Sequence, residues 1–269
     1  MIPLFSEAGR RRLDEIVKPG LICVFDFDGT LSPIVTRPDR ARLPLGIKSR
    51  LIKLLALAPV AIISGRSLAD IRPRLGFEPS YVVGNHGLEG VPGWEKFSEN
   101  YKSLCVGWKN IIETALEDKV LYDKGIVVEE KQYSLSVHYR LTFDHEKVKE
   151  QLKKLFDNLS PPARVIPGKC VFSLVPPNAV DKGRALEQLM QASGARSAIY
   201  VGDDITDEDV FDLQRSDCMS VRVGLARDSA AKFYFAHRID VVQLLDELIR
   251  RLHRRRGEQF EQFPLVRSA

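Results

Sequence analysis

The chain has 269 residues, of which 44% are hydrophobic and 28% charged, a composition that suits one large or two small packed domains and excludes bulk disorder. Its formal charge of +4 is too weak by itself to indicate a nucleic-acid partner. No apolar run approaches membrane-spanning length, and the N-terminus lacks the apolar stretch of a signal peptide. We therefore expect a soluble, reduced, cytoplasmic protein with no membrane or nucleic-acid partner.

Strands and helices alternate in the first third of the chain. Residues 6–17 predict a short helix, and residues 21–27 form a near-continuous apolar run that is typical of a strand buried on both faces of a parallel sheet. This alternation predicts a doubly wound, Rossmann-like α/β sheet. The elements that follow are a helix over 47–58, a buried strand over 60–64, a helix capped by Ser67 and a strand over 81–84.

The pattern changes in the middle of the chain and then returns. We predict an inserted α+β domain over 93–177, within a core made of 1–92 and 178–269. The inserted segment has predicted helices over 97–116 and 144–159, two strands within 125–141, and strands over 163–167 and 170–175. The rest of the core has predicted helices over 181–192, 207–215 and 241–253, and strands over 198–202 and 220–223.

Two minor features have structural interpretations. Cys23 and Cys170 lie in apolar runs outside any C-x-x-C pair, and we expect both in the core. Arginines cluster late in the chain, and we interpret them as the solvated end of a last helix followed by a frayed tail, with a polyanion-binding patch as the alternative. These arginines are Arg250, Arg251, Arg254, Arg255 and Arg256.

The motif Asp26-Phe27-Asp28-Gly29-Thr30 directly follows the first buried strand. Ligands bind at the carboxyl ends of the strands in an open α/β sheet, and Gly29 allows a sharp bend there. One carboxylate can attack phosphorus, and the other can protonate the leaving oxygen and later activate water. A plain Asp-Gly turn is the structural alternative, but turns of that kind are common, whereas an apolar run followed by this motif is rare.

Two further motifs occupy equivalent places. Ser64-Gly65-Arg66 ends the second buried strand, where a hydroxyl beside a helix N-terminus can hold a phosphate oxygen, although Ser-Gly is also ordinary loop chemistry. The acidic run over 202–209, preceded by Lys182, suits Mg²⁺, which prefers oxygen ligands. For Glu208 and Asp209 we prefer a structural role at a helix start. A metal ion and a lysine together can offset the repulsion between an anionic nucleophile and a phosphate.

These motifs, in this order, resemble the haloacid dehalogenase superfamily of phosphatases, and the resemblance covers roughly residues 21–223. It implies a haloacid-dehalogenase-type core with a parallel sheet and an inserted α+β cap domain. A narrower similarity to trehalose-phosphate phosphatases is carried by residues 84–89, Glu129, Lys131, 138–140 and 168–171, together with Pro38 and Ala41.

The resemblance also implies a role for each matching residue. Asp26 would be the nucleophile and a metal ligand, and Asp28 the general acid and base, with its backbone carbonyl on the metal. Asp203 would complete the protein ligands of a Mg²⁺ ion, supported by Asp207. The phosphoryl group would be held by Ser64 and Lys182. The substrate would be bound by Arg66, Asn85, His86, Glu129, Lys131 and Arg140. For the cap residues among these, and for His138, an exposed hairpin face is the structural alternative.

The chain departs from the family in the cap. The family usually has a glutamate four residues after the lysine of its G-K motif, and often an arginine two residues later; this chain has Ser173 and Val175. The leading hypothesis is hydrolysis of trehalose 6-phosphate to trehalose and phosphate through an aspartyl-phosphate. One alternative is the same chemistry on another sugar or glycosyl phosphate.

A second alternative is a non-catalytic protein that senses sugar phosphates. The intact set of Asp26, Asp28, Lys182 and Asp203 argues against it, since a sensor need not keep a nucleophile together with an acid. We expect a monomer whose partner is a small-molecule sugar phosphate, and, without a fused synthase segment, an enzyme that acts alone.

Overall fold

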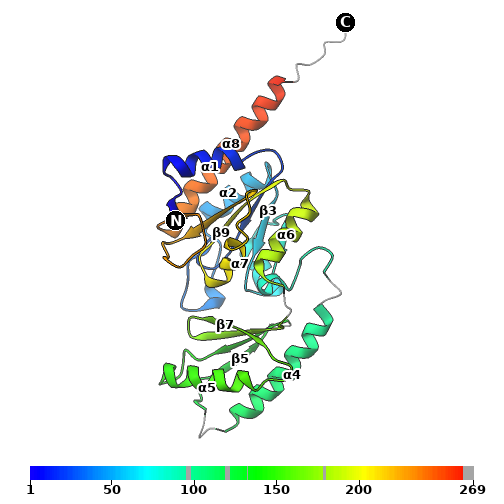
Figure 1. Ribbon diagram of the computed structural model, residues 1–269, viewed down its shortest axis with the longest axis vertical. Helices are drawn as coiled ribbons and strands as arrows, with labels where there is room; N and C mark the ends of the chain where they lie inside the picture. Colours follow the sequence, from blue (N-terminus) through cyan, green and yellow to red (C-terminus); the bar gives the residue numbers. More distant parts are fainter. Residues whose placement is uncertain (95–97, 119–121, 132, 178–179, 263–269) are drawn as a thin grey trace.

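The computed structural model describes residues 1–94, 98–118, 122–131, 133–177 and 180–262, which form two stacked units (Figure 1). Phe97, the first residue of a predicted helix, and residues 178–179, at a predicted domain boundary, lie outside the described residues. The larger unit contains a seven-stranded sheet, and the smaller one a four-stranded sheet.

The seven-stranded sheet is parallel throughout, with the order β1-β11-β10-β9-β2-β3-β4. The central strand β2 (Leu21–Phe25) is buried along its whole length, which is why its sequence is continuously apolar. Its side chains alternate between the two faces of the sheet. The other strands are β1 (Ile2–Pro3), β3 (Val60–Ile63), β4 (Tyr81–Val83), β9 (Ser197–Gly202), β10 (Cys218–Val223) and β11 (Phe233–Phe235).

Helices cover both faces of this sheet. Leu21, Cys23 and Phe25 point into a core shared with α1 (Glu7–Ile16), α2 (Leu45–Leu55), α3 (Leu68–Leu75) and α8 (Val241–Gln262). Ile22 and Val24 point into the opposite core, shared with α6 (Lys182–Ser193) and α7 (Glu208–Phe211). This two-faced burial confirms the predicted doubly wound architecture.

The four-stranded sheet is antiparallel, with the order β5-β6-β8-β7. Helices α4 (Ser98–Leu116) and α5 (His145–Asp157) cover one face, around Trp108 and Phe172, while the other face is turned toward the larger unit (Figure 1). This segment is the α+β unit expected from the sequence. Its strands are β5 (Val127–Glu130), β6 (Leu135–His138), β7 (Arg164–Gly168) and β8 (Val171–Val175).

Some local predictions are corrected. The helix predicted over 207–215 is only a 3-10 turn, Ile205–Asp207, followed by the four-residue α7. The last helix begins as predicted but extends to Gln262, and Arg251 on it is only 4% exposed and pairs with Asp14 at 2.9 Å and with Glu247. This arginine is therefore not part of a solvated helix end.

The four cysteines are free. Cys23 is in the core as expected, whereas Cys170 is half-buried in the turn between β7 and β8, with a left-handed φ of 59°. Among the described helices, none combines the length and the apolar composition that crossing a bilayer requires.

Candidate active site

The first motif forms a tight loop at the carboxyl end of β2. Asp26 continues the strand, with its amide donating to the carbonyl of Val201 on β9 at 2.9 Å. The chain then turns at Gly29, which has a φ of 89°. A Cβ at Gly29 would lie 2.0 Å from a carboxylate oxygen of Asp203, so only glycine permits this approach. The loop is fixed to the acidic segment by the Thr30 hydroxyl, which donates to Asp203 at 2.8 Å.

A buried lysine joins the third motif to the first. Lys182, at the start of α6 and 1% exposed, donates from Nζ to Asp26 at 2.8 Å and to Asp207 at 2.7 Å. Asp207 also accepts the Tyr200 hydroxyl at 2.6 Å and the amides of Asp203 and Asp204 at 2.8 Å each. With all these bonds made, the carboxylate of Asp207 holds the loop and the lysine in place.

Three carboxylates of this site form a candidate metal centre. Oxygens of Asp26, Asp203 and Asp207 all lie within 4.8 Å of one another. Burial opposes the charge on Lys182, but Asp207 and Asp26 outweigh it and raise its pKa. Burial likewise opposes ionisation of Asp207, but Lys182 and Tyr200 hold the pKa of that carboxyl below its usual range. Lys182 and Asp207 therefore form the ionised pair of the cluster.

The other two carboxyls lack a full counter-charge. Burial, reinforced by Asp207 and Asp203 and opposed by Lys182, raises the pKa of Asp26 well above its usual value. Burial and the charge of Asp207 raise the pKa of Asp203 to about 7. One lysine cannot balance three clustered carboxylates, of which Asp26 and Asp207 are buried, so the donor set fits a divalent cation with oxygen ligands, such as Mg²⁺.

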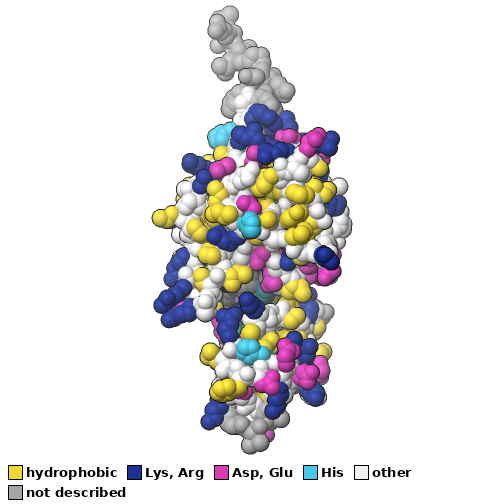
Figure 2. Space-filling view, turned by 90° about the vertical axis from the view of Figure 1, so that its left-hand side faces the viewer, with side chains coloured by type: hydrophobic (Ala, Val, Ile, Leu, Met, Phe, Trp, Pro, Cys, Tyr) yellow, Lys and Arg dark blue, Asp and Glu magenta, His cyan; other side chains and the backbone are white. Residues whose placement is uncertain are grey.

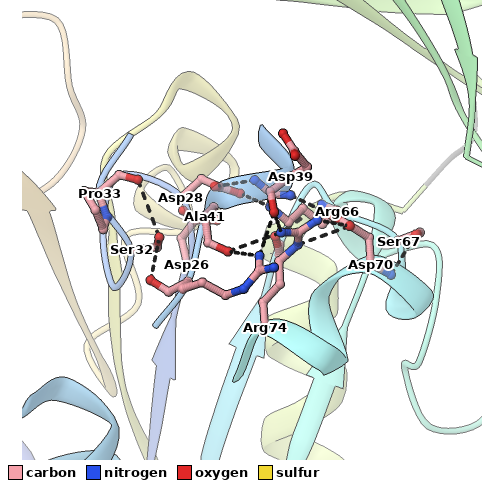
Figure 3. Close-up of polar contacts among 12 residues, drawn as sticks. Asp26, Asp28, Ser32, Pro33, Asp39, Ala41, Arg66, Ser67, Asp70 and Arg74 are labelled. Atoms are coloured by element: carbon pink, nitrogen blue, oxygen red, sulfur yellow. Dashed lines mark hydrogen bonds and ion pairs between the residues drawn. The ribbon is translucent and has the colours of Figure 1, made fainter. Parts of the chain in front are cut away.

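The second carboxylate of the first motif is held by an ion pair. Arg66 donates from Nε and Nη2 to the two oxygens of Asp28, at 2.5 and 2.7 Å (Figure 3). Its Nη1 donates to Asp70 at 2.7 Å. The structure therefore places Arg66, predicted as a substrate ligand, directly on the predicted acid–base group.

Ser64 and His86 come together at the end of β3. The Ser64 hydroxyl is buried and accepts the amide of Arg66 at 3.2 Å, while its carbonyl accepts the amide of His86 at 3.0 Å. A Cβ at Gly65 would lie 2.5 Å from Cε1 of His86, so glycine makes room for the imidazole. Burial and the nearby Lys182 and Lys131 lower the pKa of His86 to about 3, which leaves the ring neutral at physiological pH.

A cavity of about 430 Å³ lies between the two units. Figure 2 shows a hollow at this junction with acidic and basic side chains around it. The core contributes Asp26, Asp28, Arg66, His86 and Lys182, and the facing unit contributes Glu129, Lys131, His138 and Ser173. The fold thus brings most of the predicted site residues to one cavity.

Glu129 is at the centre of the polar groups on the cap side. Its carboxylate lies 2.9 Å from Nε2 of His138 and 3.8 Å from Nζ of Lys131. The contact with His138, together with the charge of Lys131, lowers the pKa of Glu129 although burial opposes this. Glu129 is therefore an ionised acceptor that faces the cavity.

Asn85 and Arg140 make contacts between the two units. Asn85 is fully buried, and its Nδ2 donates to Glu89 at 2.9 Å and to the carbonyl of Lys131 at 2.7 Å. Its Oδ1 accepts the Ser134 hydroxyl at 3.2 Å. Arg140 donates to the carbonyl of Thr36 at 3.2 Å. Neither side chain is among those that line the cavity, so substrate contact by these two residues stays a prediction, and the observed contacts dock the cap on the core.

Asp70 and Arg74 belong to the site although the sequence analysis did not identify them. Asp70 accepts hydrogen bonds from both Arg66 and Arg74, and both residues line the cavity. The signal was present in the spacing, because Asp70 and Arg74 are i,i+4 positions of α3 and Arg66 lies four residues before Asp70, just ahead of the helix. What the spacing could not show is that this side of the helix meets Asp28.

Comparisons with known proteins agree with this geometry. A sequence model of the trehalose-phosphatase family matches residues 24–236. A trehalose-phosphate phosphatase of Mycobacterium avium is 37% identical over 202 residues, which cover 71% of this chain and 50% of that protein. An uncharacterized glycosyl hydrolase of Mycobacterium tuberculosis is 37% identical over 238 residues, which cover 83% of this chain but 18% of that protein. The chain therefore spans half or less of the length of these two relatives.

Among solved structures, a trehalose-6-phosphate phosphatase related protein matches with a TM-score of 0.69 at 24% identity, over 85% of this chain and 97% of that one. This likeness confirms the predicted fold class, a doubly wound parallel α/β core with a second α+β unit.

Proposed function

This chain belongs to the trehalose-phosphatase family, and we propose on that premise that it is a phosphoric monoester hydrolase that converts trehalose 6-phosphate to trehalose and phosphate. The observation that carries the proposal is the shared cavity. Its core side holds a carboxylate paired with a buried lysine, Asp26 with Lys182, and its cap side holds Glu129 and other polar groups suited to sugar hydroxyls. We also propose that 93–177 is the inserted cap and that 1–92 with 178–269 is the catalytic core.

The proposed reaction has two steps. A carboxylate oxygen of Asp26 attacks phosphorus, the bond from phosphorus to the sugar oxygen breaks, and Asp28 gives its proton to the leaving oxygen. Water then attacks the aspartyl-phosphate, Asp28 takes a proton from that water, and the bond from phosphorus to Asp26 breaks. Lys182 offsets the negative charge at the reacting carboxylate, and Ser64 and the neutral His86 lie at the adjacent strand end.

We propose that the metal is Mg²⁺, held by the carboxylates of Asp26 and Asp203 and the backbone carbonyl of Asp28, with Asp207 supporting the site. When bound, it would neutralise charge on the phosphoryl oxygens and on the clustered carboxylates. The support for this assignment is the short spacing of the carboxylates and the raised pKa values of Asp26 and Asp203.

Addition of Mg²⁺ is expected to raise the thermal stability of the protein, because it relieves repulsion among buried carboxylates in the folded state only. At a concentration about a hundred times Kd, the gain in unfolding free energy is about 2.7 kcal/mol. Differential scanning calorimetry with and without Mg²⁺ measures it. Asp203→Asn should lose the effect, and the matched change at exposed Asp212 should keep it. An equal shift in wild type and Asp203→Asn would contradict this assignment of the metal.

Glu129→Gln is expected to lower kcat/KM for the sugar phosphate by roughly 10- to 150-fold, since a hydrogen bond to a charged group contributes about 1.5–3 kcal/mol. Hydrolysis of p-nitrophenyl phosphate, which has no sugar, should change little. Glu130→Gln is the matched control, because the next side chain along β5 pairs with Lys109 and does not line the cavity. Equal losses of kcat/KM on both substrates would show that Glu129 does not recognise the sugar.

A second candidate function keeps the chemistry and changes the sugar. Ser173 lines the cavity in place of the glutamate expected from the family, and in the sheet it pairs with Ser136. The Ser136 hydroxyl is buried and has no hydrogen-bond partner among the described residues. A neutral hydroxyl, that of Ser173, therefore lines the cavity where the family presents a carboxylate, with the buried Ser136 beside it in the sheet, and this change favours a different pattern of sugar hydroxyls.

A phosphate-release screen over sugar phosphates, with and without Mg²⁺, tests the proposed function. A preference for trehalose 6-phosphate over monosaccharide phosphates would support the leading proposal. A preference for monosaccharide phosphates would favour the second candidate. Binding of sugar phosphates with no phosphate release would indicate a sensor and would overturn both.

A further inference from the structure

Arg66 makes an unusually complete ion pair with the carboxyl group that the proposed mechanism uses as acid and base. Two of its nitrogens reach the two oxygens of Asp28, and the third reaches Asp70. The Arg66 side chain is 12% exposed, and its Cζ lies 5.8 Å from the centroid of the Phe27 ring. Burial opposes its charge, but Asp28 and Asp70 outweigh this and raise its pKa. Arg66 is therefore a fixed cation with both its charged partners in place.

A scaffold behind Arg66 fixes its position. Asp70 accepts from Arg66 on one oxygen and from Arg74 on the other. Arg74 in turn donates to the carbonyls of Asp39 at 2.8 Å and Ala41 at 3.2 Å, in the segment that follows the nucleophile loop (Figure 3). Each link is a hydrogen bond to a charged group, the stronger class of such bonds. Arg66, just before α3, is thereby tied to Asp28, and Arg74 on α3 is tied to the segment that follows the loop.

This geometry restricts what Asp28 can do. A carboxylate has about four lone-pair sites, and the bidentate contact occupies one on each oxygen. Proton transfer to a leaving oxygen requires one carboxyl oxygen within hydrogen-bond reach of it. The free lone pair of one oxygen can therefore serve the leaving oxygen, while the contacts with Arg66 keep the carboxyl group from rotating away.

We propose that Arg66 is a positioning residue for proton transfer: its guanidinium fork, formed by Nε and Nη2, aligns Asp28. One oxygen of Asp28 stays on this fork, and the other gives the proton to the leaving group and then takes one from water. Asp70 and Arg74 hold the fork in place. The proposal rests on the proposed function, in which Asp28 is the acid and base. It differs from the substrate-binding role predicted from sequence, because Arg66 acts here through Asp28.

The test compares two phosphate esters that lack a sugar. The leaving group of p-nitrophenyl phosphate departs without protonation, whereas that of phenyl phosphate is much more basic and needs an acid. The ratio of their kcat/KM values reports leaving-group protonation alone, since both share every later step. In Arg66→Gln, kcat/KM for phenyl phosphate should fall about 10- to 100-fold more than kcat/KM for p-nitrophenyl phosphate, which is within the range of general acid catalysis. Arg66→Lys should recover part of the lost activity on phenyl phosphate.

A double-mutant cycle adds a second readout. In Asp28→Asn the acid is already absent, so the kcat/KM ratio of the two esters should already be shifted against phenyl phosphate. Adding Arg66→Gln should then change the ratio by less than about twofold, as for residues that act through one another. Asp70→Asn should give a weaker form of the Arg66→Gln effect. Arg72→Gln is the matched control on α3, because Arg72 pairs with Glu78 outside the cavity, and it should leave both rates unchanged.

The outcomes distinguish failure of the role proposed for Arg66 from failure of the proposed function. Equal losses on both esters in Arg66→Gln, or losses that add to those of Asp28→Asn, would overturn the positioning role and assign Arg66 to phosphate binding or folding. Retention of turnover by Asp26→Asn would instead refute the proposed mechanism. Cleavage of both esters without cleavage of any sugar phosphate would refute only the proposal that the substrate is a sugar phosphate. The ratio of the rates on the two esters would still decide the role of Arg66.

Discussion

Asp26→Asn is expected to abolish turnover, with a loss on the order of 10⁴ or more, the scale seen when a nucleophile is removed from a constellation that acts as a unit. The amide cannot form the aspartyl-phosphate on which both proposed steps depend. Folding should be preserved, because Lys182 keeps its bond to Asp207 and the change removes one of three clustered carboxylates. Phosphate release measures the rate, and acid quench with labelled substrate detects the phosphoenzyme.

A stability measurement and a comparison variant serve as controls for this prediction. The thermal midpoint of Asp26→Asn should equal or exceed that of wild type without metal, because burial and neighbouring acids already disfavour the charge there. Asp204→Asn is a suitable comparison, since Asp204 is an exposed acid on the cavity rim outside the carboxylate cluster. Turnover at the wild-type rate in Asp26→Asn would refute the assignment of Asp26 as the nucleophile.

Lys182→Met is expected to cause the largest loss of stability, about 3–5 kcal/mol, the usual cost of leaving a buried partner charge uncompensated. The lysine is the cation between Asp26 and Asp207, and both carboxylates are nearly inaccessible to water. Activity should fall as well, because the phosphoryl group loses a cation beside the nucleophile. Urea unfolding without metal, monitored by circular dichroism, gives the free energy of unfolding.

Arg184→Met is the matched control for this change. Arg184 lies two residues along the same helix and is exposed, so its replacement should alter stability by no more than about 0.5 kcal/mol. Mg²⁺ should recover part of the stability of Lys182→Met, because a divalent cation compensates the same carboxylates. A Lys182→Met protein as stable as the Arg184→Met protein would show that the buried cluster does not depend on the lysine for its charge balance.

The core of the fold was predictable because burial on both faces leaves a direct record in the sequence. Strands β2, β3 and β9 are continuous apolar runs, and each is followed by polar residues at the edge where ligands bind. The nucleophile, the lysine and the acidic segment could therefore be located before their contacts were known. Strands β1 and β11, of two and three residues, were missed, since pairing with a neighbour, rather than their own pattern, makes them strands.

Prediction from local sequence failed in two places where side chains make contacts with distant parts of the chain. The predicted helix over 207–215 is shortened, and at its start Asp207 accepts two loop amides, Lys182 and Tyr200 with its carboxylate. Arg251 was assigned to solvent because its neighbours in sequence are charged, but the packing of α8 against α1 places it on Asp14. Neither outcome can be predicted from the local sequence alone.

The sequence by itself determined the chemistry at one end of the cavity, because strand, turn and carboxylates are adjacent in the chain. Only the tertiary structure decided how that chemistry is controlled. The pairing of Arg66 with Asp28 joins residues 38 positions apart, and the docking of Asn85 on the carbonyl of Lys131 joins the core to the cap across 46 positions. Such contacts depend on which helix face and which sheet face meet in space, and that is set by the packing of the whole chain rather than by the pattern of any one segment.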